Sequence, residues 1–169
     1  LRKLLDLLNK ENKSEQVSIF LSDGIYESAL NIPIRRSNIH IRSKSASAKQ
    51  VILIGNGMKK SKYDESIFDV SASNITISDI TMKNASNHLI QIRAEKNADH
   101  FTLRNCILQD AFQQLIKVSG VLNGEYSDYG VIENNIFEYT AGVGPNYYIG
   151  GIDAHRARFW KVSNNRFYN

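Results

Sequence analysis

The stretch NITISDITM, residues 74–82, decides the fold because three similar stretches follow it. These are HFTLRNCIL from His100, YGVIENNIF from Tyr129 and FWKVSNNRF from Phe159. The four copies align on one polar column at steps of 26, 29 and 30 residues, made up of Asp79, Asn105, Asn134 and Asn164. A repeat of this length predicts a solenoid, in which each copy forms one supersecondary unit that stacks on the next.

The residues around the column predict two short strands joined by a bend. Aliphatic residues stand two places before it (Ile77, Leu103, Ile132, Val162), and apolar residues stand three places after it (Met82, Leu108, Phe137, Phe167). Asn and Asp tolerate left-handed backbone and bond neighbouring amides, which suits a tight bend. A weaker copy, NIHIRS, places Ile41 two residues before Ser43.

A third strand recurs between the copies: IFDV (67–70), LIQI (89–92), LIKV (115–118) and GGIDA (150–154). Three short strands in each turn of roughly 20–30 residues are typical of a parallel β-helix. An antiparallel β-sandwich is the alternative, and it predicts tight Asn-Gly hairpins between alternating strands. GNG at 55–57 and NG at 123–124 do not lie in that position. We therefore expect an all-β chain folded as a parallel β-helix.

The ends of the chain complete the expected domain organisation. LRKLLDLLNK, residues 1–10, has leucines at helical spacing and predicts a helix that caps the first coil. We expect one domain over residues 1–169, with β-helix coils over 17–169. The sequence stops in mid-coil at NNRFYN. We therefore expect a C-terminally truncated part of a longer chain, in which further coils or another chain cover the open end.

Composition limits the classes of function. The net charge of +4 suits a polyanionic partner without requiring one. Cys106 is the single cysteine, so an intrachain disulfide is excluded. Apolar runs such as VILIG are far shorter than the ~20 residues that span a bilayer, so we expect no membrane partner. The mixed charges of MKKSKYDES, residues 58–66, favour a solvated loop over a nucleic-acid contact, and no nucleic-acid partner is expected.

Three stretches carry a resemblance to a known group of proteins. LSDGIYESALNI (21–32), NHLIQIRAEKNADHFTLRNCILQDA (87–111) and GPNYYIGGIDAHRARFWKVSNNRFYN (144–169) resemble right-handed parallel β-helix repeat proteins of the pectate-lyase-like superfamily, more narrowly a bacterial family without an established reaction. The resemblance implies a right-handed helix, an extended carbohydrate partner and an extracellular or periplasmic location. It also implies that the strands at 67–70, 89–92, 115–118 and 150–154 carry the cleft. Fold alone does not fix function.

Alternation along those strands predicts two outward columns of polar side chains. The first column is Asp69, Gln91, Lys117 and Asp153, and the second is Ser71, Arg93, Ser119 and His155. The same alternation turns Ile152 and Ala154 toward the core. Past the last strand, Arg156 and Arg158 are expected to line the turn and Trp160 to face the core. Gly150 and Gly151 are expected to permit a close approach of backbone or ligand.

The polar columns suit an acidic, uronate-containing glycan. Removing the proton next to a uronate carboxylate needs a cation for the carboxylate and a base for the proton. We assign the base to Lys117 or His155 and the cation to Arg93, with Asp153 orienting the base. Asp69 and Asp153 together are an alternative Ca²⁺ site, although no resident cofactor is expected. The competing interpretation is structural, since opposite charges on adjacent strands stabilise a sheet without catalysis.

The remaining predicted ligand-binding residues are Gln91, Asp69 and Ser119 on the sheet and Tyr126, Tyr147 and Tyr148 in the loops at 120–130 and 139–151. Tyrosine rings beside a polar groove are natural stacking platforms for sugar rings. No structural metal site is expected, because Asp153 and His155 lack a further His or Cys at zinc spacing. The sequence thus predicts a polysaccharide-directed β-helix protein, and if it is an enzyme, we expect a lyase acting on an acidic, uronate-containing glycan. The alternative is a non-catalytic carbohydrate-binding or structural module of a secreted or surface protein.

Overall fold

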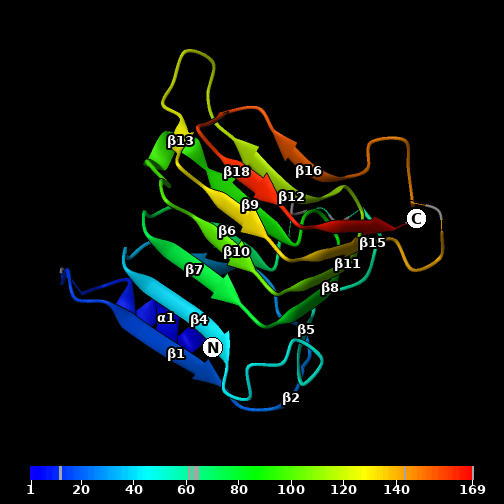
Figure 1. Ribbon diagram of the computed structural model, residues 1–169, viewed down its shortest axis with the longest axis horizontal. Helices are drawn as coiled ribbons and strands as arrows, with labels where there is room; N and C mark the ends of the chain where they lie inside the picture. The colour runs from blue at the N-terminus through cyan, green and yellow to red at the C-terminus, as the bar shows by residue number, and fades with distance from the viewer. Residues whose placement is uncertain (12, 61, 63–64, 143, 169) are drawn as a thin grey trace.

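The protein is built of parallel strands that stack in successive layers from the N-terminal to the C-terminal part of the chain (Figure 1). The computed structural model describes residues 1–11, 13–60, 62, 65–142 and 144–168. Within them the chain is mostly β, with one α-helix, α1 (Arg2–Leu8), and one 3₁₀ turn, η1 (Ala94–Lys96). The stacked strands are consistent with the β-helix expected from the repeat.

Three sheets run along the stack, and each of the first five coils contributes one strand to each sheet in turn, whereas the last coil contributes strands to sheets A and B among the described residues. Sheet A contains β1 (Val17–Leu21), β4 (Ile39–Ser43), β7 (Ile75–Ser78), β10 (Thr102–Arg104), β14 (Val131–Glu133) and β18 (Lys161–Ser163). Sheet B contains β2 (Gly24–Tyr26), β5 (Val51–Ile54), β8 (Thr81–Ala85), β11 (Ile107–Ala111), β15 (Ile136–Glu138) and β19 (Arg166–Tyr168). Sheet C contains β3 (Ile32–Ile34), β6 (Phe68–Val70), β9 (Ile90–Arg93), β12 (Gln114–Ser119) and β16 (Gly150–Ala154).

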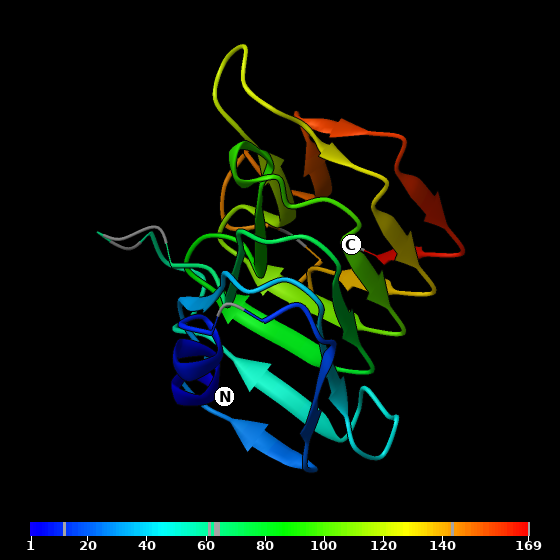
Figure 2. The same cartoon turned by 90° about the vertical axis from the view of Figure 1, so that its left-hand side faces the viewer.

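Neighbouring strands pair in parallel, in the register that the repeat predicts. Ile77 lies opposite Leu103, Leu103 opposite Ile132, and Ile132 opposite Val162. The column after the bend keeps the same register, from Met82 through Leu108 and Phe137 to Phe167. Figure 2 shows the strands rising coil by coil from the N-terminal to the C-terminal part of the chain. The prediction of two strands joined by a bend in each copy is confirmed.

The anchor column consists of left-handed bends between sheets A and B. Asp79, Asn105, Asn134 and Asn164 have φ of 59°, 55°, 58° and 55°. The first three bend amides donate to the next coil: Asp79 N to Arg104 O at 3.2 Å, Asn105 N to Glu133 O at 3.3 Å and Asn134 N to Ser163 O at 3.2 Å. Asn105 Nδ2 also donates to Asp79 Oδ1 at 3.2 Å. These bonds hold the bends in line, one above the other.

The core fills the space between the three sheets. Its members are aliphatic or aromatic residues at alternate strand positions, among them Ile41, Ile77 and Leu103, which are fully buried. The column of sheet B ends in stacked rings, where buried Phe137 and exposed Phe167 lie 4.7 Å apart between ring centroids. Trp160 stacks against Phe101 at 6.3 Å, and its Nε1 donates to Ser127 O at 2.8 Å, as expected for a core-facing ring.

The N-terminal helix covers the free edge of sheet C. It spans Arg2–Leu8, slightly shorter than the expected 1–10, and buries Leu5 completely. Asn9, directly after the helix, bonds the edge strand β3 and the residue that follows it. Its Nδ2 donates to Pro33 O at 2.9 Å, and its Oδ1 accepts from Arg35 N at 2.8 Å. The capping role is therefore supported by contacts, since an open strand edge leaves backbone groups unpaired.

Of the two residues expected to face the core, Ile152 packs against it, whereas Ala154 is not buried. Both lie in register with buried residues of β12, Ile116 and Val118. Ile152 is nevertheless only half-buried, and Ala154 is exposed. They belong to the last strand of sheet C, and no described residue adds a further strand to that sheet. Their direction follows the alternation, but burial also needs a neighbour on both sides.

A second column of asparagines, one residue after the bend, lies inside the fold. Asn135 is 1% exposed. Its Oδ1 accepts from Cys106 N at 2.9 Å, and its Nδ2 donates to Leu103 O at 3.1 Å and Asn165 Oδ1 at 3.0 Å. Asn165 Nδ2 donates in turn to Ile132 O at 2.8 Å. These side chains satisfy backbone groups that the tight bend removes from the strand ladders.

We predict that Asn135→Ala lowers the free energy of unfolding by about 2–5 kcal/mol, because it leaves a buried N–H and a buried C=O without partners. Urea unfolding measures the effect. The control is Asn134→Gly at the adjacent bend. Glycine also tolerates the φ of 58° found there, so this substitution is expected to change the free energy of unfolding by less than about 1 kcal/mol. Equal effects of the two substitutions would show that the buried asparagine column does not stabilise the coils.

Candidate functional site

The predicted polar columns lie side by side on sheet C. Asp69 pairs with Gln91, Gln91 with Lys117, and Lys117 with Asp153 in the parallel register. In the second column, Arg93 pairs with Ser119. The amide of His155 follows β16 and bonds Val118 O at 3.0 Å, which places His155 on the rung after Ser119. The buried residues between these positions, such as Ile92 and Val118, fix the outward direction of both columns.

Four side chains form one connected cluster at the C-terminal end of the columns, and we call it the Asp153 cluster. Asp153 is its centre. Its Oδ2 accepts from Lys117 Nζ and from Tyr148 Oη, the latter at 3.1 Å. Its Oδ1 lies 2.8 Å from His155 Nε2. Lys117 Nζ also donates to Tyr148 Oη at 3.0 Å. One carboxylate thus joins a lysine, a histidine and a tyrosine.

The loop that carries Tyr148 is tied to sheet C and to the end of β11. Gln114 Nε2, at the start of β12, donates to Tyr148 O at 3.4 Å. Asn146 Nδ2 donates to Phe112 O, and Asn146 Oδ1 accepts from Tyr148 N at 2.6 Å. These bonds bring the tyrosine over Lys117, with the ammonium 5.5 Å from the ring centroid. The loop therefore covers the lysine rather than leaving it open to solvent.

The electrostatics of the cluster favour charged forms of both partners. Burial alone would lower the pKa of Lys117, but the hydrogen bonds to Asp153 and Tyr148 outweigh burial, and this pKa is raised. Burial alone would raise the pKa of Asp153, but the hydrogen bond and charge of Lys117 outweigh it, and this pKa is lowered. Lys117 is therefore a cation and Asp153 an anion near neutral pH. Of the two bases expected from the sequence, the raised pKa disfavours Lys117.

The tautomer of His155 follows from its partner. Near neutral pH the ionised Asp153 only accepts hydrogen bonds, so His155 Nε2 must carry the proton that lies between them. In the neutral imidazole the other nitrogen, Nδ1, then has a free lone pair. The side chain of His155 is 63% exposed, so this nitrogen can meet a molecule from solvent. The arrangement provides a base that a carboxylate orients.

In the N-terminal half of the two columns the polar side chains bind one another, whereas the sequence predicted that they would face a ligand. Arg93 was expected as the free cation for a carboxylate. Its Nε and Nη2 instead bind the carboxylate of Asp69, with Nη2 2.7 Å from Oδ2. Gln91 was expected to line the groove, but it is 6% exposed and donates to Ser119 Oγ at 2.7 Å. Cross-rung pairing within the columns therefore takes up these groups.

The two carboxylates of the alternative Ca²⁺ site do not come together. Asp69 and Asp153 stand three rungs apart, about 14 Å at the usual spacing of parallel strands. Each carboxylate is bound by cations of its own, Arg93 for Asp69 and Lys117 for Asp153. Among the described residues no group of three or more His, Cys, Asp and Glu side chains could hold a metal ion.

The other predicted stacking tyrosines lie outside the Asp153 cluster. Tyr126 has the guanidinium groups of Arg158 and Arg156 over its ring, at 4.3 and 5.1 Å from the centroid. Arg158 also forms a bidentate pair with Asp128 at 2.7 and 2.8 Å, beside the short parallel pair of β13 (Ser127–Asp128) and β17 (Ala157–Arg158). Arg156 lies in the turn as expected, whereas Arg158 belongs to β17. Tyr147 is 99% exposed in the loop beside Tyr148.

The glycine pair before Asp153 has two different environments. A Cβ at Gly151 would lie 2.7 Å from Phe167 Cε1, whereas one at Gly150 would meet only Gln114 Cγ at 3.7 Å. Gly151 does permit a close approach, but by the ring of Phe167 rather than by backbone or ligand, and this ring is 55% exposed. Gly151 lets Phe167 pack beneath β16.

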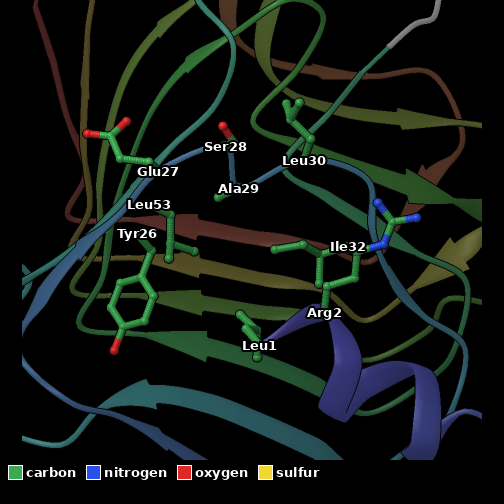
Figure 3. Close-up of a pocket in the computed structure, with 9 residues that line it drawn as sticks. All are labelled: Leu1, Arg2, Tyr26, Glu27, Ser28, Ala29, Leu30, Ile32 and Leu53. Atoms are coloured by element: carbon green, nitrogen blue, oxygen red, sulfur yellow. The ribbon is translucent and has the colours of Figure 1, made fainter.

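A cavity of about 300 Å³ lies at the other end of the molecule, between α1 and the first two coils. Figure 3 shows Leu1, Ile32 and Leu53 directed toward its centre, whereas the Glu27 carboxylate points away. Arg2, Tyr26, Ser28, Ala29 and Leu30 complete the lining. None of the predicted site residues lies there, so the cavity is separate from the Asp153 cluster.

Comparison of the chain with protein-family models, with curated proteins and with solved structures finds no match. Function is therefore argued from the geometry of the chain itself. None of the helices that the structure describes is long and apolar enough to cross a membrane.

We predict that the stabilising effect of the Lys117–Asp153 pair disappears in acid. A lowered pKa means that the contribution of Asp153 is present above the ordinary aspartate value of about 4 and is lost as the pH falls through the folded value. Lys117, with its raised pKa, loses its contribution only as the pH rises past about 10.4. Urea unfolding of Asp153→Asn, compared with its parent from about pH 3 to about pH 9, measures the effect.

Both proteins in this comparison carry His155→Gln, so that the imidazole does not contribute to the pH dependence of stability. Asp153→Asn is expected to destabilise the protein at neutral pH, and the destabilisation is expected to shrink as the pH falls through the lowered folded pKa of Asp153. A destabilisation that is the same in acid and at neutral pH would show that the ion pair does not stabilise the fold.

Proposed function

We propose that the protein acts on an extended, acidic polysaccharide and that the Asp153 cluster is the site of contact. The observation that carries the proposal is the Asp153 carboxylate, which orients the imidazole of His155 next to the ammonium of Lys117. A base beside a fixed cation is what uronate chemistry requires. A lyase reaction on a uronate-containing glycan is the form of the proposal that uses Lys117, His155 and Asp153 together.

Lys117 supplies the cation that neutralises the uronate carboxylate. An ammonium has three N–H donors. The described residues engage two of them, through Asp153 and Tyr148, so the third has no protein partner among these residues. A uronate carboxylate can accept this hydrogen bond. Neutralising the carboxylate acidifies the adjacent C–H, because the negative charge that develops during proton removal is stabilised.

His155 supplies the base. Its Nδ1 takes the proton from the carbon next to the carboxylate, and the electron pair of that C–H bond forms a carbon–carbon double bond. The glycosidic C–O bond on the neighbouring carbon breaks, and its oxygen leaves with the bonding electrons and takes a proton from solvent. Asp153 stabilises the imidazolium that forms, since its carboxylate lies 2.8 Å from Nε2. No cofactor enters these steps.

The wider setting of this proposal rests on the sequence resemblance. The proposed handedness of the β-helix is right-handed, as in the pectate-lyase-like superfamily, and the proposed location is extracellular or periplasmic. Parallel stacking of the strands supports the β-helix itself. Further coils or another chain over the last coil would extend the groove beyond β16, where Ala154 is exposed and Ile152 half-buried.

A second candidate function is a non-catalytic carbohydrate-binding or structural module. The observation that favours it is the pairing of charges along sheet C. Arg93 is bound to Asp69 and Lys117 to Asp153, so two cations of the columns already have carboxylate partners. Such pairs stabilise a sheet with no reaction. The two functions differ in one respect that can be measured, the formation of a cleaved product.

We predict that Lys117→Met weakens binding of polygalacturonate by about tenfold or more, because it removes a charge-assisted hydrogen bond. His155→Gln is expected to retain binding and to abolish turnover, since the amide is no base. Calorimetric titration measures binding, and the ultraviolet absorbance of the new double bond measures elimination. Melting temperatures of the variants are recorded alongside, and that of His155→Gln is expected to change little.

The matched control is Lys44→Gln, which removes one exposed positive charge from a loop outside sheet C and is expected to leave binding unchanged. Neutral glycans and single-stranded DNA complete the panel. Binding without elimination in the parent protein would establish the second candidate function. Preference for DNA, or equal loss of binding in Lys117→Met and Lys44→Gln, would contradict both functions.

A further inference from the structure

The outward face of sheet A carries a second set of polar side chains, separate from sheet C. Over three successive strands, two outward columns stand next to each other, and we call the six residues the basic grid. In the first column His40 pairs with Thr76 and Thr76 with Thr102; in the second, Arg42 pairs with Ser78 and Ser78 with Arg104. The grid thus contains two arginines, one imidazole and three hydroxyl groups, without a carboxylate.

The two arginines are weakly compensated by protein charges. Arg104 is exposed, and no described carboxylate oxygen lies within 4.0 Å of its guanidinium. Glu133 occupies the next rung beside it but forms no ion pair at that distance. Arg42 Nη2 lies 3.9 Å from Asp79 Oδ2, and its guanidinium lies 5.8 Å from the ring centroid of Phe20. A single long contact is therefore the only ionic link of the pair within the described residues.

Asp79, the nearest carboxylate, is already occupied. Its Oδ2 accepts from Ser78 Oγ at 2.7 Å and its Oδ1 from Asn105 Nδ2 at 3.2 Å, and it is 8% exposed. Because the Ser78 hydroxyl donates its one proton to Asp79, the His40 Nε2 at 3.0 Å must donate to Ser78 Oγ. The carboxylate belongs to the bend, where Ser78 and Asn105 engage it.

The electrostatic field at His40 agrees with the excess of positive charge in the basic grid. Burial lowers the pKa of His40, and the charges of Arg104 and Arg42 lower it further, whereas Asp79 raises it by less. Both arginines are therefore close enough to act on the same imidazole. The grid has a net positive potential near neutral pH.

The spacing of the arginines leaves room for a ligand between them. Arg42 and Arg104 are two rungs apart, about 10 Å between backbone positions. The residue between them is Ser78, whose short side chain is fully buried. Guanidinium groups on either side of a small residue can turn toward one group placed above it. Thr76 and Thr102, half-buried in the adjacent column, add hydroxyl donors on one side.

We propose that the basic grid binds a tetrahedral oxyanion, a sulfate or phosphate group, between Arg42 and Arg104. Guanidinium groups match the oxygens of such anions with paired hydrogen bonds, and they remain charged at every physiological pH. The guanidinium groups of Arg42 and Arg104 and the hydroxyl groups of Thr76 and Thr102 belong to the same outward face, and the carboxylate of Asp79 is engaged at the bend. The site lies on a different sheet from the Asp153 cluster, so it does not depend on the function proposed for that cluster.

Isothermal titration calorimetry of the whole protein with inorganic sulfate, inorganic phosphate and dextran sulfate tests the proposal. Saturable binding is expected, and Arg104→Gln and Arg42→Gln are each expected to weaken it about tenfold. Dextran sulfate binding tighter than inorganic sulfate would identify a sulfated polymer as the source of the anion. Equal affinity per site for dextran sulfate and inorganic sulfate would identify a free ion as the source of the anion. Unsulfated dextran serves as the ligand control.

Arg166→Gln is the matched control variant, because Arg166 is an exposed arginine on sheet B, outside the grid. It is expected to bind like the parent protein. Equal weakening by Arg166→Gln and Arg104→Gln would show attraction by net charge alone and overturn the site. Absence of saturable binding in the parent protein would overturn it as well. Melting curves without anion confirm that each variant is folded, and Arg104→Gln, at an exposed position, keeps the test valid if Arg42→Gln is unstable.

Discussion

Parallel register between coils is the constraint on which the rest of the structure depends. A strand in one coil bonds the strand one turn later, so a shift of one residue would turn every side chain to the other face of its sheet. The bends at Asp79, Asn105, Asn134 and Asn164 hold that register. They share left-handed backbone, and the first three donate their amides to the following coil. Because the bends are aligned, the aliphatic columns are aligned too, and the polar columns on the outer faces follow from them.

The Asp153 cluster shows how this register creates chemistry from residues far apart in sequence. Lys117 and Asp153 are 36 residues apart and lie opposite each other only because β12 and β16 pair in register. The loop before β16 then brings Tyr148 onto the same two groups. One carboxylate keeps the lysine charged and fixes the proton on the histidine. The same register on sheet A places Arg42 and Arg104 around Ser78 without bringing a carboxylate between them.

Much of this architecture could be predicted from the sequence because it is local and repetitive. The bend column, the strand pairs and the outward columns on sheet C all follow from residue spacing, and the structure has them in the expected register. Contacts between rungs could not be predicted in the same way. Alternation gives the direction of Arg93 and Gln91 but not their partners, Asp69 and Ser119. The buried column of Asn135 and Asn165 was missed because the two residues follow the bend and look like further turn residues. Their shared spacing of one residue after Asn134 and Asn164 was the available signal.

The central claim is that the Asp153 cluster is where an acidic glycan meets the protein, and amide chemical-shift mapping by NMR tests it most directly. An oligogalacturonate is titrated into the ¹⁵N-labelled chain, and the shifts are followed residue by residue. The account predicts saturable shifts centred on Lys117, Tyr148, Asp153 and His155, with those of sheet B unchanged. Saturable shifts confined to residues away from β12 and β16, or no saturable shift at all, would contradict it.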